Sequence, residues 1–200
     1  MCACVAGVIA VAAPAAAQAF PEYWEVKPPA TWGVLPPATP VGVKLVGSLA
    51  INGGKSGNIE YKSTCSVTAI EQVENQLLVG TTLIEGFDEM LSFASNCSFN
   101  GSAPYPCAAG ENYSLSAISG WPSELIPNYD VFSGVSLQVT CAISGKTAVY
   151  KAPGGVWTGK LGTSSIVFPA TGIFKHPPYF FYLSGTLKLK PFTPPYTAIR

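Results

Sequence analysis

Acidic side chains are the first residues of this 200-residue chain that could do chemistry together. Glu85, Asp88 and Glu89 cluster in the sequence, and three further acids are isolated, namely Glu111, Glu124 and Asp130. Two carboxylates that face each other across a cleft can hydrolyse a glycosidic bond, and several together can bind calcium. The spacing fits no EF-hand, and a chain with 11 acids is bound to contain such a group. A charged turn is therefore the simplest interpretation, and we predict no metal site.

His176 is the only histidine, and two prolines follow it. A Ser-His-Asp arrangement needs a histidine held between a nucleophile and an orienting acid. The sequence contains no G-x-S-x-G motif that would supply the nucleophile. We therefore interpret His176 as a solvated loop residue, assign no catalytic residue and expect no cofactor.

Large aromatic side chains supply the other candidate site. Four of them could form a platform on which sugar rings stack, because each combines an apolar face with a polar group. These candidate ligand-binding residues are Trp121, Trp157, Tyr179 and Tyr182. The simpler alternative places Trp157 and Phe181 in the core and lets Trp121 cap a turn, since large aromatics dominate protein cores.

Four cysteines predict two disulfides. Cys65, Cys97, Cys107 and Cys141 remain once a signal peptide is removed, and an even number is typical of an exported chain. We favour Cys97–Cys107, which brackets a short segment of turn-forming residues. The remaining pair is Cys65–Cys141, whose members share the parity of the apolar residues in their strands. The spacings match no zinc site.

The N-terminus has the pattern of a secretory signal peptide. Residues 5–17 are almost wholly small and apolar, and they lead into Ala17-Gln18-Ala19, which has the A-x-A form of a cleavage site. No basic residue precedes this run, so we expect the true start codon to lie upstream. The run is also too short to span a bilayer. We predict a signal peptide over residues 1–19 and a secreted or surface-associated mature protein without stable membrane insertion.

The charge balance excludes one class of partner. The chain has 11 basic and 11 acidic residues and no run of lysine or arginine. A nucleic-acid-binding protein needs clustered positive charge to displace counterions from phosphates. We therefore expect no nucleic-acid partner.

The elements that must position these residues are predicted to be strands. Gly and Pro number 20 and 18, only 11% of residues are charged, and apolar residues alternate with polar ones in short segments. Strands are predicted over residues 43–51, 59–67, 77–84, 90–99, 113–118, 135–143, 147–151, 155–161, 163–168 and 180–189. Turns or loops are predicted at 71–76, 85–89 and 120–124. Because the first and last of these strands are alike, we infer that they pair in one sheet.

The domain organisation follows from these segments. Residues 20–41 contain six prolines and predict an extended N-terminal arm, which either docks on the domain or projects from it. A β domain over 42–191 and a tail over 192–200 follow. The fold class is all-β, as an antiparallel β-sandwich or a partly open barrel.

The order of the cysteine motifs resembles that of uncharacterised exported proteins of soil actinobacteria. The residues that carry the resemblance are Ser63-Thr-Cys65, Phe93-Ala-Ser-Asn-Cys97, Cys107, Gly120-Trp-Pro122 and Val135-Ser-Leu-Gln-Val-Thr-Cys141. It covers roughly residues 43–190 and implies a secreted bacterial β domain, with no known activity. We therefore favour a non-enzymatic module, structural or binding, whose partner is a cell-wall or environmental glycan or an envelope protein. The alternative is a carboxylate-based glycan hydrolase.

Overall fold

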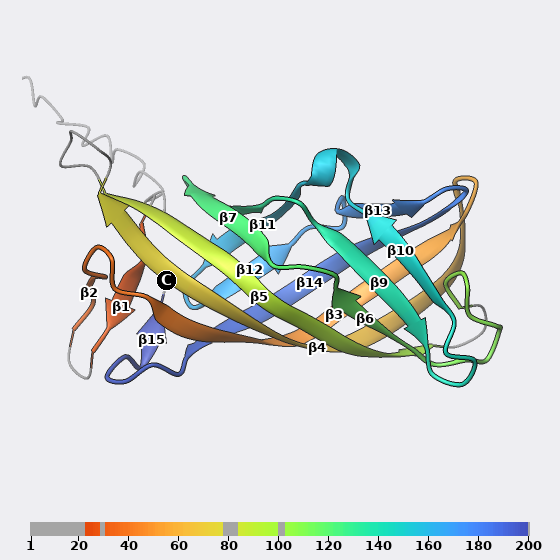
Figure 1. Ribbon diagram of the computed structural model, residues 1–200, viewed down its shortest axis with the longest axis horizontal. Coiled ribbons are helices and arrows are strands. Elements are labelled where there is room, and N and C mark those ends of the chain that lie inside the picture. The colour runs from red at the N-terminus through yellow and green to blue at the C-terminus, as the bar shows by residue number, and fades with distance from the viewer. Residues whose placement is uncertain (1–22, 29–30, 78–83, 100–102, 200) are drawn as a thin grey trace, which may run out of the picture.

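The computed structural model describes residues 23–28, 31–77, 84–99 and 103–199 (Figure 1). The predicted signal peptide, the first residues of the arm and most of the predicted strand over 77–84 lie outside these ranges. Within them, no helix has the length and apolar character needed to cross a membrane.

In the described part of the chain, twelve strands form one antiparallel sheet, which confirms the predicted all-β class. Their order in the sheet is β12-β11-β8-β7-β5-β4-β3-β14-β13-β10-β9-β6. In chain order they are β3 (Val41–Lys55), β4 (Asn58–Leu77), β5 (Ile84–Phe99), β6 (Tyr113–Ala117), β7 (Trp121–Ile126), β8 (Tyr129–Phe132), β9 (Ser136–Cys141), β10 (Thr147–Lys151), β11 (Trp157–Gly162), β12 (Ser165–Phe168), β13 (Ile173–His176) and β14 (Tyr179–Pro191).

Two further pairings, β12 with β14 and β5 with β6, close this sheet into two rings of strands. The long strands β5, β4, β3 and β14 belong to both rings and run along the length of the molecule (Figure 1). The first ring is completed by β7, β8, β11 and β12, and the second ring by β6, β9, β10 and β13. β14 pairs with β13 through residues 179–182 and with β12 through residues 185–188, so its partner changes near Gly185. The inferred pairing of the first and last long strands is confirmed, since β3 and β14 are antiparallel neighbours.

Aromatic side chains fill the interior. Trp157 stacks on Phe168 with their ring centroids 3.8 Å apart, and Phe132 packs beside both inside the first ring. In the second ring Phe181 contacts Tyr150 with a centroid distance of 4.7 Å. This core holds the four shared strands against the shorter strands that cover them.

The three segments predicted as turns or loops are strands. Residues 71–76 belong to β4, residues 85–89 to β5, and residues 121–124 to β7. In each segment polar residues take inward positions that apolar residues would normally fill: Glu71 and Asn75, Asp88, and Ser123. The alternation of apolar and polar residues, on which strand prediction depends, is therefore lost in these segments.

The Pro-rich arm docks on the domain. Its strands β1 (Glu25–Lys27) and β2 (Gly33–Val34) form a small sheet with β15 (Ala198–Ile199), so the arm and the C-terminal tail pair with each other. Trp24 and Leu35 of the arm are fully buried. Asn75 of β4 holds both, because its side-chain amide donates to the carbonyls of Trp24 (2.9 Å) and Leu35 (2.8 Å) and its Oδ1 accepts from the Trp24 N–H (2.7 Å).

All four predicted cysteines form disulfides, but the predicted pairing is wrong. The bonds are Cys65–Cys97 and Cys107–Cys141. Cys65 and Cys97 are direct neighbours across β4 and β5, with Cα atoms 4.0 Å apart, so the sheet register brings them together. The predicted pairing rested on the short segment between Cys97 and Cys107 and on the strand parity of Cys65 and Cys141, neither of which contains the register of β4 and β5.

Candidate functional site

Three carboxylates converge inside the first ring. Glu71 of β4, Asp88 of β5 and Asp130 of β8 each place a carboxylate oxygen within 4.8 Å of the others. Glu71 and Asp130 are 0% exposed and Asp88 is 6% exposed. We call these three residues the carboxylate cluster.

The sheet register explains how residues distant in sequence meet here. Asp88 lies opposite Ser123 of β7, which lies opposite Phe132 of β8. Asp130 points to the same side as Phe132, because it lies two residues earlier in the strand. The hydroxyl of Ser123 donates a hydrogen bond to Oδ1 of Asp88 and so orients that carboxylate toward the cluster.

The cluster lacks partners for its charge. Neither carboxylate oxygen of Glu71 has a hydrogen-bond partner among the described residues. The carboxyl groups of Asp88 and Asp130 lie within hydrogen-bonding reach of each other, and Ser123 lies within reach of both. The buried polar side chains in these ranges include no lysine, arginine or histidine. Removal from water raises the pKa of Glu71 and of Asp88 well above the ordinary value, and repulsion from Asp130 adds to both shifts. Desolvation likewise raises the pKa of Asp130.

The geometry of the cluster does not match that of a glycosidase site. A hydrolase of that type needs two acids that reach a substrate in a cleft. Here the carboxylates lie in the packed interior, where no polysaccharide can approach them. The sequence analysis grouped Asp88 with Glu85 and Glu89, but Glu89 is exposed on the opposite face of β5. Asp130 and Glu124 were seen as isolated acids; the structure brings Asp130 into the cluster and leaves Glu124 exposed.

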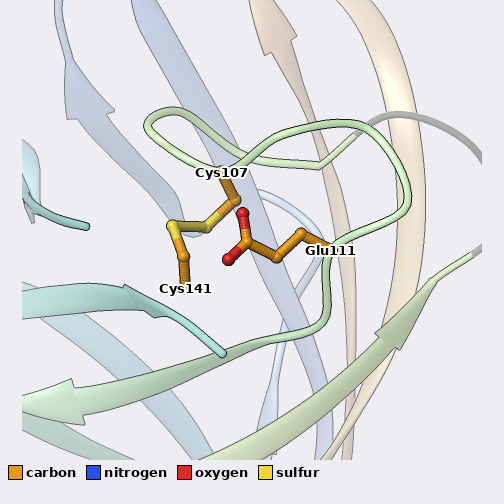
Figure 2. Close-up of side chains that lie close together, drawn as sticks. All are labelled: Cys107, Glu111 and Cys141. Carbon is orange, nitrogen blue, oxygen red and sulfur yellow. A yellow bond between two sulfur atoms is a disulfide. The ribbon is translucent and has the colours of Figure 1, made fainter. Parts of the chain in front are cut away.

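Glu111 lies beside the Cys107–Cys141 disulfide, as Figure 2 shows. Its carboxylate accepts hydrogen bonds from the backbone N–H groups of Ala108 (3.1 Å), Ile143 (2.8 Å) and Ser144 (2.6 Å). These bonds, the one from Ser144 foremost, lower the pKa of Glu111 to about 2. Because the two sulfurs are bonded to each other, they present no thiolate, and Glu111 serves to fasten the loop before β6 to the turn after β9.

A second candidate site lies on the outer surface, where β13 meets β14. A pocket of about 290 Å³ opens there, close to the lower limit for small-molecule sites. Its lining, which we call the tyrosine pocket, consists of Gly57, Ile173, Lys175, Pro177, Pro178, Tyr179, Phe180 and Tyr182. The backbone N–H of Ser56 donates to the carbonyl of Pro178 (2.9 Å), so the β3–β4 turn is fixed to the β13–β14 turn at the rim.

Aromatic stacking supports Tyr179, one of the residues that line the tyrosine pocket. The ring of Tyr105 stacks on Tyr179, with centroids 4.5 Å apart and planes 5° apart, and also on His176, the cross-strand partner of Tyr179, with centroids 5.3 Å apart. His176 also donates from Nδ1 to the carbonyl of Val149 (2.9 Å). It is therefore a half-buried residue of β13, and the prediction of a solvated loop histidine is wrong.

A polar groove lies on the outer face of β4, β5, β6 and β9. It encloses about 660 Å³, and hydroxyl and amide side chains without charge dominate its lining. These side chains are Thr64, Ser66, Asn96, Ser98, Asn112, Ser114 and Thr140. Tyr182 of the tyrosine pocket pairs with Asn52 of β3, which pairs with Lys62 of β4, two residues before Thr64. The pocket and the groove therefore lie on the same face of the shared strands.

The structure separates the four predicted ligand-binding aromatics into two pairs. Tyr179 and Tyr182 line the tyrosine pocket. Trp121 and Trp157 are 0% and 2% exposed and pack edge to face in the core, with centroids 6.0 Å apart. Trp157 and Phe181 thus have the core positions that the simpler interpretation gave them, whereas Trp121 is a buried residue of β7 and not the cap of a turn.

The sequence analysis missed Glu71, Tyr105 and the polar groove. Glu71 was placed in a turn, and Tyr105 lies in a loop between two cysteines without strand periodicity. The groove did leave a signal, because exposed Thr64, Ser66 and Thr68 alternate with buried residues along β4. Compared with protein-family models, curated proteins and solved structures, the chain has no match in any of the three.

Proposed function

We propose that this protein is an exported, non-enzymatic binding module whose ligand is a glycan of the cell wall or the environment. The observation that carries the proposal is that the tyrosine pocket and an uncharged polar groove lie on the same outer face of the shared strands. A sugar ring has apolar faces that pack on aromatic rings and hydroxyl groups that need hydrogen-bond partners. The pocket offers the first and the groove the second.

The charges around the pocket favour a neutral or acidic sugar. Lys175 lines the pocket, and Nζ of Lys55 lies 5.7 Å from the centre of the Tyr179 ring. Among the residues that the structure describes, no acidic side chain lines the pocket. A carboxylated or acetylated sugar ring would therefore be accepted without repulsion.

Export is supported by the signal-peptide pattern, by the resemblance to exported actinobacterial proteins and by the two disulfides, which are typical of oxidising compartments. The hydrolase alternative loses support because the acids that converge, Glu71, Asp88 and Asp130, are buried, whereas the exposed Glu89 and Glu124 lie outside this cluster.

The test is retention of the oxidised protein on insoluble polysaccharides and purified cell walls. We expect saturable binding that Tyr182→Ala weakens at least tenfold, because the substitution removes a ring from the pocket. Tyr129→Ala is the matched control, since Tyr129 is an exposed tyrosine of β8 outside the pocket. Ser66→Lys places a long charged side chain over the groove and should weaken retention on polysaccharides more than binding of single sugars by calorimetry.

Absence of retention on every glycan would contradict the proposal. So would an equal loss in Tyr182→Ala and Tyr129→Ala. An envelope protein would then become the better candidate partner.

A further inference from the structure

The carboxylate cluster has a feature that the proposed function does not use. It concentrates three acids in the interior of the first ring, where Ser123 is the neutral donor to the aspartates and no described residue donates to Glu71. Met90 and Trp121 lie in the same cross-strand row as Glu71, so apolar side chains surround the charges. An ionised carboxylate in such surroundings destabilises the fold unless a positive charge compensates it.

The carboxylate oxygens that lack a hydrogen-bond donor indicate that a cation supplies the compensating positive charge. Glu71 is fully buried, neither of its oxygens has a hydrogen-bond partner among the described residues, and one of them lies within 4.8 Å of an oxygen of Asp88 and of Asp130. We propose that the carboxylate cluster binds one calcium ion, with Glu71, Asp88 and Asp130 as its protein ligands. Calcium prefers carboxylate oxygens and accepts both one-oxygen and two-oxygen binding by each group.

The ligand type and number favour calcium over magnesium. One oxygen from each carboxylate lies within 4.8 Å of the others, which is compatible with a shared ion. The three carboxylates offer up to six oxygens, and calcium takes six to eight in flexible geometry. Magnesium demands near-octahedral geometry and usually keeps several of its waters, which a buried site lined by carboxylates does not favour.

The position of the site determines how the ion is acquired. Because the ligands come from three strands of one closed ring and are buried, the site exists only in the folded chain. Calcium must therefore bind as the ring closes, and its binding free energy stabilises the fold. This role is independent of the tyrosine pocket and the polar groove.

The test is the metal content and thermal stability of the oxidised full-length chain, refolded with EDTA, calcium or magnesium. We expect one calcium per chain by mass spectrometry of the metal. At calcium a hundredfold above its Kd, Tm should rise by about 5–10 °C over the EDTA sample. Magnesium at the same concentration should give less than a third of this shift.

Shape-preserving substitutions separate the calcium site from general stability. Glu71→Gln and Asp130→Asn should each abolish the calcium-dependent rise in Tm while leaving Tm in EDTA unchanged or higher, because each removes a buried charge. Glu124→Gln, on the exposed face of β7, should keep the full calcium response. If a substituted chain does not fold, the metal content and the EDTA comparison of the parent chain still decide the matter.

Three results would overturn the proposal. One is a parent chain without bound calcium and with the same Tm in EDTA and calcium, which would mean that the cluster holds protons. Another is stoichiometric binding of a different cation in preference to calcium. The third is a calcium response that survives in Glu71→Gln and Asp130→Asn.

Discussion

Glu111 accepts hydrogen bonds from three backbone N–H groups, and its pKa is lowered to about 2. A carboxyl group whose pKa falls on folding contributes stability above its unfolded pKa of about 4.5, and this contribution is lost as the pH falls toward 2. Glu111→Gln should therefore lower Tm at pH 7. The difference in Tm between the parent and the variant should shrink between pH 4.5 and 2. A difference that stays constant over that range would show that the charge of Glu111 contributes nothing.

Folding shifts the pKa values of the carboxylate cluster upward, in the direction opposite to the shift of Glu111. Burial raises the pKa of Glu71 and Asp88, so without metal the folded chain keeps protons that the unfolded chain releases above about pH 4. In EDTA the free energy of unfolding, measured with urea, should therefore fall as the pH rises above 4. Glu71→Gln should flatten this dependence, whereas Glu124→Gln should leave it in place. Stability that increases from pH 4 to 7 in EDTA would contradict the assignment.

At the scale of elements, Asn75 connects the N-terminal arm to β4. Its side chain makes three hydrogen bonds to the backbone of Trp24 and Leu35, and it is fully buried. Asn75→Ala removes all three and leaves backbone groups of the arm unpaired, which should cost roughly 2–4 kcal/mol. Faster amide exchange in β1 and a red shift of Trp24 fluorescence would report release of the arm. If both signals are unchanged while stability falls, the arm is held by its apolar contacts and not by Asn75.

Most strands were predictable because their inward positions are apolar. The strand predicted over 147–151 coincides with β10, and the strand over 180–189 lies within β14. Sequence reasoning failed where β4, β5 and β7 place Glu71, Asp88 and Ser123 inside the first ring. A polar inward residue removes the alternation of apolar and polar residues that identifies a strand. The segments of β4 and β5 that contain Glu71 and Asp88 were therefore predicted as turns or loops.

The candidate site was only partly predictable for the same reason. Tyr179 and Tyr182 are recognisable as aromatics on a strand, but which face they occupy depends on the register of β13 and β14. Trp121 and Trp157 have the same chemistry and lie in the core. The disulfide pairing likewise depends on the β4–β5 register, which local spacing does not contain.

At the scale of the whole molecule, both disulfides lie in the part of the chain that builds the second ring. Cys65 pairs with Cys97, Cys97 lies opposite Tyr113, and Tyr113 lies opposite Cys141. The two bonds span 32 and 34 residues, so the chain-entropy model gives each roughly 4 kcal/mol.

Removing the Cys107–Cys141 bond should thus lower the free energy of unfolding by about that amount. The double substitution Cys107→Ser and Cys141→Ser, compared with the corresponding change at Cys65 and Cys97 in urea titrations, measures both contributions. Peptide mapping without reduction checks the pairing. A Cys97–Cys107 peptide in the parent chain would contradict the pairing described here.

The partnership of β3 with β14 also sets the order of events during synthesis. β3 is among the first strands to be made and β14 is the last long one, yet the two are hydrogen-bonded neighbours, and both rings close through β14. Neither ring can be completed until residues 179–191 have left the ribosome, and contacts this distant in sequence form slowly. Both rings therefore stay open until β14 has been made, and a chain exported as proposed would reach a translocation channel for unfolded chains in that state.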